Sequence, residues 1–276
     1  MSAIRLGPRS VTAIAVMSVL GLLAFGWPLL VEPGAQLAQG PDGPWLFTLL
    51  VPLLLAVVLA EIAEGGMDAK SVALLGVLTA VAAALRPLSG GVTGFQPMFV
   101  VIVLAGRVFG PGFGFVLGST SMIASALVTG GVGPWLPFQV LGAAWLGLGA
   151  GMLPRARGRT EVLLLAGYGA MGSLIYGMLL NLWFWPFLAT SGEISFIAGA
   201  PITENLGRLL AFTLATSLGF DIPRAIGTSL LLLALGRPAL TALRRTHRRA
   251  AFAETRRDQS GIEQPDHLEP DEAVNR

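Results

Sequence analysis

The sequence predicts an all-α integral membrane protein, and three observations lead to this fold class. Hydrophobic residues make up 54% of the 276-residue chain and charged residues only 12%, whereas a soluble domain carries about 25% charged residues. Apolar runs recur at the length that a helix needs to cross a bilayer, about 17–25 residues. The chain has no cysteine, and both histidines lie in its last 30 residues. These features exclude a cytosolic enzyme, a disulfide-stabilised scaffold and a cysteine-ligated metal site.

Eight apolar runs are candidate membrane spans. Pro97–Val108 is the short one, about 18 Å at 1.5 Å per residue, and it can cross only if the bilayer thins there or the helix extends back through Val92–Gln96. In chain order the eight runs are Val11–Val31, Trp45–Ile62, Ser71–Leu85, Pro97–Val108, Gly112–Thr129, Pro134–Leu153, Val162–Leu188 and Ile222–Leu243.

The apolar stretch Leu206–Gly219 is not counted as a span. A helix from Asn205 to Arg237 would be about 50 Å long, which is too long for a hydrocarbon core of about 30 Å. The sequence Asp221-Ile222-Pro223 favours a helix start, because Asp is a preferred N-cap and Pro fits the first turn. We therefore expect Leu206–Gly219 to be a re-entrant or interfacial segment.

Basic residues indicate how the spans are oriented. With both termini in the cytoplasm, the inner segments hold 12 Lys or Arg residues and the outer segments hold 3, as the positive-inside rule requires. A signal peptide is the alternative for Val11–Val31, but its apolar run exceeds the usual length of about 7–15 residues. The inner residues are Arg5, Arg9, Lys70, Arg107, Arg155, Arg157, Arg159, Arg237, Arg244, Arg245, Arg248 and Arg249, and the outer ones are Arg86, Arg208 and Arg224.

The same pattern predicts three domains in a multi-pass protein of the cell membrane. Residues 1–62 form an N-terminal transmembrane hairpin, and residues 63–250 form a six-span core. Residues 251–276 are too charged to bury enough surface for folding, so we expect a disordered cytoplasmic tail. No stripe of basic residues interleaved with aromatic ones suggests a nucleic-acid partner.

Several function classes are disfavoured by what the spans lack. Asp221 and Arg224 can pair near an outer helix end, and Glu61 lies at the inner end of the second span, so no ionisable group lies at mid-bilayer, where an ion-driven carrier needs one. The chain has no G-x-x-x-x-G-K-[ST] loop and so does not hydrolyse nucleotide itself. No serine–histidine pair or aspartate pair lies within the spans. We therefore expect neither catalysis nor a cofactor.

Small residues recur along Ala69–Ala84 with alternating spacings of four and three. They make one face of this helix nearly flat, so another helix can approach closely, either a partner protein or a neighbour within this chain. The small-xxx-small sets at Gly110, Gly114 and Gly118 and at Gly147 and Gly151 indicate packing inside the bundle. The members of the flat face are Ala69, Ala73, Gly76, Ala80 and Ala83.

Polar and aromatic residues gather in three predicted outer segments, Arg86–Gln96, Gly130–Gln139 and Leu188–Asp221, and at the outer end of the span before the last of these. Tryptophans at a membrane interface often form a belt against lipid headgroups. Unpaired amides at bilayer depth cost free energy, however, so the amides together with stacked aromatics suit a flat, neutral, hydrogen-bonding ligand. The candidate ligand-binding residues are Arg86, Phe95, Gln96, Trp135, Phe138, Gln139, Asn181, Trp183 and Trp185.

Residues 69–249 resemble the substrate-binding S component of energy-coupling factor (ECF) vitamin transporters. The resemblance lies in the small-residue helix, in the turn over residues 106–114 (GRVFGPGFG), in the segment 133–139 (GPWLPFQ) and in the aromatic cluster Asn181–Phe187. It implies a six-helix bundle with a vitamin pocket near the outer face. It also implies a transmembrane coupling protein and two ATPase subunits as partners, the coupling protein packing on Ala69, Ala73, Gly76, Ala80 and Ala84.

The hairpin over residues 11–62 is an addition to that pattern and inherits no role from the family. The long outer segments and the tryptophans favour a cobalamin-like corrinoid, with riboflavin, biotin or a precursor base also open. A ligand-free membrane scaffold or assembly protein is the alternative function. An enzyme acting on lipid is disfavoured by the lack of ionisable residues at a common depth.

Overall fold

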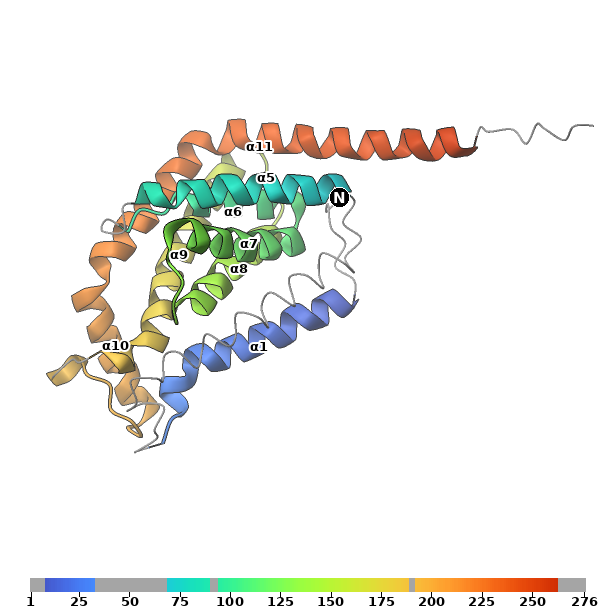
Figure 1. The fold of residues 1–276 in the computed structure, drawn as a ribbon. Helices are drawn as coiled ribbons and strands as arrows, with labels where there is room; N and C mark the ends of the chain where they lie inside the picture. The colour runs from blue at the N-terminus through green and yellow to red at the C-terminus, as the bar shows by residue number, and fades with distance from the viewer. Residues whose placement is uncertain (1–7, 33–68, 90–93, 189–191, 263–276) are drawn as a thin grey trace, which may run out of the picture.

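The computed structural model describes residues 8–32, 69–89, 94–188 and 192–262, and these residues form helices and connecting turns without a strand. Figure 1 shows α5 to α9 at the centre of the bundle, with α1 along one side and α11 along another. The helices are α1 (Pro8–Leu30), α5 (Ala69–Leu85), α6 (Met98–Phe109), α7 (Pro111–Thr129), α8 (Leu136–Met152), α9 (Gly158–Phe184), α10 (Ile202–Thr216) and α11 (Leu218–Ile262).

The predicted spans that fall on described residues coincide with helices, whereas Trp45–Ile62 lies outside those residues. Within the described residues, four stretches are long and apolar enough to cross a membrane, and three further apolar helices, α5, α6 and α8, are shorter. Nearly every side chain of the short α6 is buried, because other helices surround it, and it therefore needs no full-length contact with lipid. The four long stretches are Ser10–Leu30, Pro111–Thr129, Gly158–Phe187 and Leu218–Thr246.

Glycine and proline set the boundary between α6 and α7. Gly110 ends α6 with φ of 100°, a conformation that L side chains rarely adopt. Pro111 then opens α7, where its missing N–H costs no helical hydrogen bond. The two helices therefore separate sharply at Gly110-Pro111.

The closest helix contact in this part of the fold joins α7 to α8 through backbone rather than side chains. A Cβ atom at Gly114 would meet the carbonyl oxygen of Gly147, and one at Gly118 would meet that of Ala143. Glycine lets the two helix backbones touch, and this favours tight packing where lipid gives no hydrophobic drive. The predicted internal role of these glycines is confirmed for this pair of helices.

Helix α1 packs against α8 and α9 through aromatic side chains. The Phe25 ring lies 4.9 Å from that of Phe138, centroid to centroid, in an edge-to-face arrangement. The indole of Trp27 donates a 3.0 Å hydrogen bond to the carbonyl oxygen of Trp183. These contacts fix α1 to the core.

Helix α10 ends at Thr216 and α11 begins after Ser217. This boundary is close to the predicted one at Asp221, which lies in the first turn of α11. Helix α10 buries Asn205, Leu209 and Phe212 on one face. On the other side of α10, aliphatic side chains, including Leu206 and Leu210, are exposed. The stretch Leu206–Gly219, expected to be re-entrant or interfacial, is thus divided between the separate helix α10 and the start of α11.

Helix α11 continues to Ile262 and projects beyond the bundle (Figure 1). The beginning of the segment 251–276, expected from its composition to be disordered, is therefore helical. Alanine, glutamate and arginine are frequent there, and these residues favour a helix even where nothing packs against it. Residues 263–276 lie outside the described part.

Candidate functional site

A cluster of polar side chains lies where α5, α7 and α8 meet. Arg86 directly follows α5 and donates hydrogen bonds of 2.8 Å to Ser125 Oγ on α7 and to Gln139 Oε1 on α8. The same guanidinium also contacts the Met122 sulfur. Two predicted ligand residues, Arg86 and Gln139, are thus brought together.

The segment before α6 closes over the start of α11. Gly94 has φ of 69°, and its Cα lies so close to the backbone of Phe220 that no side chain would fit. The ring of Phe95 packs against Gly227, where an added side chain would collide with it. This backbone contact positions Gln96, which follows directly.

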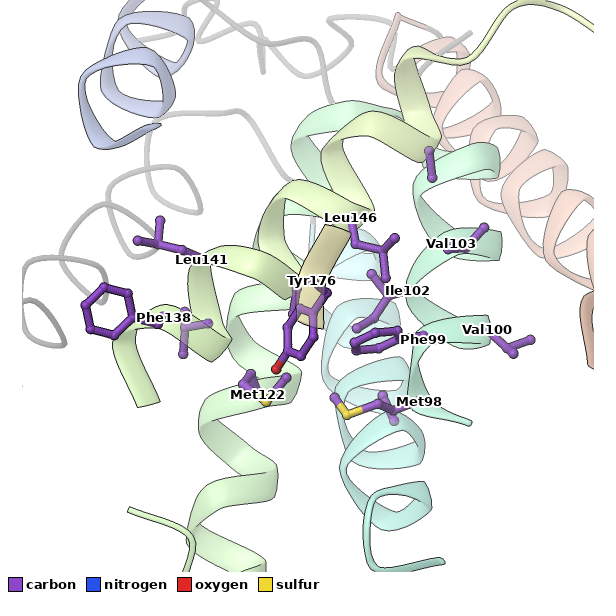
Figure 2. Packing of buried hydrophobic residues seen from close by; sticks show 14 of the residues in the cluster. Met98, Phe99, Val100, Ile102, Val103, Met122, Phe138, Leu141, Leu146 and Tyr176 are labelled. Carbon is purple, nitrogen blue, oxygen red and sulfur yellow. The ribbon is translucent and has the colours of Figure 1, made fainter. Parts of the chain in front are cut away.

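Tyr176 on α9 lies at the centre of this region. Its ring meets Phe99 edge to face with centroids 5.0 Å apart and covers Gly142 of α8. In Figure 2 its hydroxyl oxygen points toward Met122, the residue that contacts Arg86. Tyr176 therefore connects the α7–α8 side of the cluster with α9.

The predicted pairing of Asp221 with Arg224 is confirmed. Arg224 Nη1 lies 2.7 Å from Asp221 Oδ1, and both side chains are buried. The guanidinium also lies 5.3 Å from the centre of the Tyr176 ring, and its Nη1 donates to the Ser173 carbonyl. The carboxylate of Asp221 fits against Gly177, where a side chain would collide with it. A buried ion pair thus borders Tyr176.

In the part of the chain that the structure describes, four buried polar atoms have no hydrogen-bond partner. Leaving such an atom unpaired costs about 1–3 kcal/mol, so a bound molecule that supplied partners would recover that free energy. The four atoms include two donor–acceptor hydroxyls, one acceptor and one donor, a set that suits a neutral ligand with both kinds of group. They are Gln96 Oε1, Ser121 Oγ, Tyr176 OH and Arg224 Nε.

Sequence reasoning missed Tyr176, Ser121 and Ser125, and it read Asp221 and Arg224 only as a pair. A tyrosine inside an apolar helix resembles an ordinary core residue. The ion pair at one helix end was the available signal, because a buried charge pair is unusual in a span and often marks a site.

The other predicted ligand residues are dispersed. Phe138 and Trp183 stack with centroids 4.2 Å apart and planes 4° from parallel, and both are buried. Trp185 is buried separately and donates to the carbonyl of Ile194. Trp135 is 42% exposed and bonds back to Gly131. These aromatic residues do not converge on one mouth.

Asn181 is held between helices. Its Nδ2 donates to Thr213 Oγ1 at 3.2 Å and to Ser217 Oγ at 2.7 Å. Its amide therefore ties α9 to α10 and to the residue between α10 and α11. This is a helix-bridging arrangement.

The flat face of α5 is turned outward. Nothing lies within 4 Å of where a side chain would begin at Gly76, whereas Ala83, which the spacing of small residues placed on this face, is buried and does not belong to it. The face is defined by five exposed residues, Ala69, Ala73, Gly76, Ala80 and Ala84.

Among the residues described, no three His, Cys, Asp or Glu side chains are placed to hold a metal ion.

Comparison with known proteins gives one family: a family model described as "ECF transporter, substrate-specific component" matches residues 70–236. No curated protein and no solved structure matches the chain.

Proposed function

The chain belongs to the family of ECF transporter substrate-specific components, and we propose that it binds a vitamin or related micronutrient at its outer face for an ATP-driven importer. Membership implies a membrane subunit that works with the transmembrane and ATPase units of an ECF module rather than an enzyme. The matched residues 70–236 extend from the start of α5 into α11.

Four buried side-chain polar atoms that have no partner among the described residues carry the proposal of a ligand site. Gln96, Ser121, Tyr176 and Arg224 come from four segments far apart in sequence. A scaffold without a ligand would gain stability from pairing or replacing these groups. Their presence supports a site in which the ligand provides the partners.

The sequence-predicted contacts divide into two roles in this proposal. Arg86, Gln96, Gln139 and Phe95 line the ligand site together with Tyr176. The remaining predicted residues stabilise the helices around the site, because their polar atoms bond to the protein or their rings pack against one another. They are Trp135, Phe138, Asn181, Trp183 and Trp185.

The burial of Trp183 and Trp185 bears on the size of the ligand. These tryptophans favoured a cobalamin-like corrinoid when only the sequence was considered, but inside the protein they offer no stacking surface to a bulky ring. Riboflavin and biotin are smaller and present both donors and acceptors. All three are to be tested directly.

Coupling is assigned to the exposed face of α5. Small side chains let the backbone of a partner helix approach closely, which is how helices associate in lipid. The five residues Ala69, Ala73, Gly76, Ala80 and Ala84 share this face, and the coupling protein is the partner that we assign to it. Eight spans with both termini cytoplasmic complete the proposed arrangement.

Uptake by cells tests the function. Cells that express the ECF module with this chain are expected to accumulate one of cobalamin, riboflavin or biotin, and cells with the module alone are not. Binding of the same compound to the purified chain provides the second measurement. A chain that is required for assembly of the module but binds and imports none of a vitamin panel would support the scaffold alternative instead.

A further inference from the structure

The end of the bundle away from Tyr176 is built around one buried carboxylate. Glu161, in the first turn of α9, accepts hydrogen bonds of 2.7 Å from Arg107 Nε on α6 and from Arg244 Nη2 on α11. Arg107 also donates to the carbonyl of Leu153 at the end of α8. Glu161 thus joins the start of α9 to α6 and α11, and Arg107 adds the end of α8.

Exposed arginines surround this centre. Arg155, Arg157 and Arg159 lie in or next to the connection between α8 and α9, and Arg245 follows the Arg244 that Glu161 binds. No hydrogen bond or ion pair joins these four side chains to another described residue. With Arg107 and Arg244 they carry six positive charges against the single negative charge of Glu161, a net of +5 over these described side chains.

Among the residues whose side chains the structure describes, the other acidic residues lie elsewhere in the fold. Glu193 and Glu204 belong to the segment between α9 and α11, Asp221 begins α11, and Glu32 follows α1. The charge around Glu161 is therefore not offset locally by another described side chain.

Apolar side chains border these arginines. Met152 at the end of α8 is 70% exposed, and Leu163 near the start of α9 is 62% exposed. In a membrane subunit such residues contact acyl chains, so the neighbouring arginines lie at the depth of the lipid headgroups. A guanidinium binds a phosphodiester with two parallel hydrogen bonds, and basic residues beside spans attract anionic lipid.

We propose that Arg155, Arg157, Arg159 and Arg245, positioned by the Glu161 centre, form a binding site for the headgroup of an anionic phospholipid such as phosphatidylglycerol. Glu161 acts as a positioning residue, because it fixes α9 against α11 and so brings the two groups of arginines together. The site is independent of the identity of the transported compound.

The test uses the purified full-length chain in phosphatidylcholine nanodiscs with or without added phosphatidylglycerol. The midpoint of thermal unfolding and the number of retained lipids by native mass spectrometry are measured. Phosphatidylglycerol is expected to raise the midpoint of the native chain. In the variant Arg155→Gln/Arg157→Gln/Arg159→Gln the apparent affinity for the lipid should fall roughly tenfold to a hundredfold.

Two controls test whether the response is specific to these arginines and to a lipid. Arg208→Gln removes a half-buried arginine from the other end of the bundle, where it pairs with Glu204, and should leave the lipid response unchanged. Inorganic phosphate at the same concentration should not reproduce the shift, and if it does, the lipid assignment is wrong. The proposal is also overturned if the triple variant responds to phosphatidylglycerol as the native chain does.

Discussion

Arg86 and Gln139 are joined by a 2.8 Å hydrogen bond between Nη2 and Oε1, which ties the end of α5 to the first turn of α8. The helix whose exposed face we assign to the coupling protein therefore ends inside the cluster that we assign to the ligand. A shift of α5 on docking moves Arg86 and, with it, Gln139. We expect ligand binding and docking to influence each other, and by thermodynamic linkage the two effects on affinity are equal.

Replacing the Tyr176 hydroxyl tests the ligand site with a matched control. Tyr176→Phe removes a hydroxyl that has no described hydrogen-bond partner, so the free energy of unfolding should change little while affinity falls about tenfold to a hundredfold. Tyr168→Phe removes a 2.7 Å bond to the Leu146 carbonyl and should lower stability without changing affinity. Calorimetric binding and thermal unfolding of both variants provide the comparison. Equal affinity for Tyr176→Phe and the native chain would place the site elsewhere.

The two amides predicted from the sequence should behave differently. Gln139→Leu removes the acceptor of Arg86 and is expected to lower affinity for the transported compound by roughly tenfold or more, together with some loss of stability. Asn181→Leu breaks only the bonds between helices and should lower the unfolding temperature while leaving affinity per folded molecule unchanged. An affinity loss confined to Asn181→Leu would reverse our assignment.

Leucine on the flat face of α5 should interrupt coupling. Ala73→Leu or Ala80→Leu adds bulk where a partner backbone has to approach, at a cost of about 1–3 kcal/mol in packing. Co-purification with the coupling protein and uptake should both fall, whereas vitamin binding to the isolated chain should not. Ala234→Leu places the same change on an exposed position of α11 and serves as control. Normal co-purification of both α5 variants would show that another surface meets the partner.

Single cysteines can establish the topology because the native chain has none. Thr160→Cys lies at the exposed start of α9 and should react with a membrane-impermeant maleimide only after the cells are opened. Thr203→Cys, exposed at the start of α10, should react in intact cells. Labelling of the Thr160→Cys variant from outside would reverse the proposed orientation.

Loss of the Glu161 charge should weaken the fold. Glu161→Gln leaves Arg107, a nearly buried side chain, without its anion, and breaking a buried pair costs about 3 kcal/mol. Glu204→Gln breaks an exposed pair with Arg208 and should cost only about 0–1 kcal/mol. Chemical unfolding in detergent compares the two. Similar losses for both variants would mean that Glu161 is not an anchor for the helices around it.

The helices were largely predictable, whereas the site was not. Apolar length located α6 and α7 almost to the residue, because the apolar runs stop where Gly110-Pro111 and Gly130 end the helices through local backbone geometry. The stack of Phe138 on Trp183 depends on how three helices meet, and no local pattern encodes that. Tyr176 was missed for the same reason. The helical extension of α11 was missed because composition reports burial better than it reports helix propensity.

The hydrogen bond from Trp27 to Trp183 spans 156 positions of sequence. A ribosome adds roughly 5–20 residues per second, so α1 is made about 8–30 s before its acceptor carbonyl exists. For most of that interval the Phe25 ring lacks Phe138 to pack against, and throughout it the Trp27 indole lacks the Trp183 carbonyl. During biogenesis α1 must therefore remain in the membrane without these partners, and it packs against α8 and α9 only after they have been synthesised.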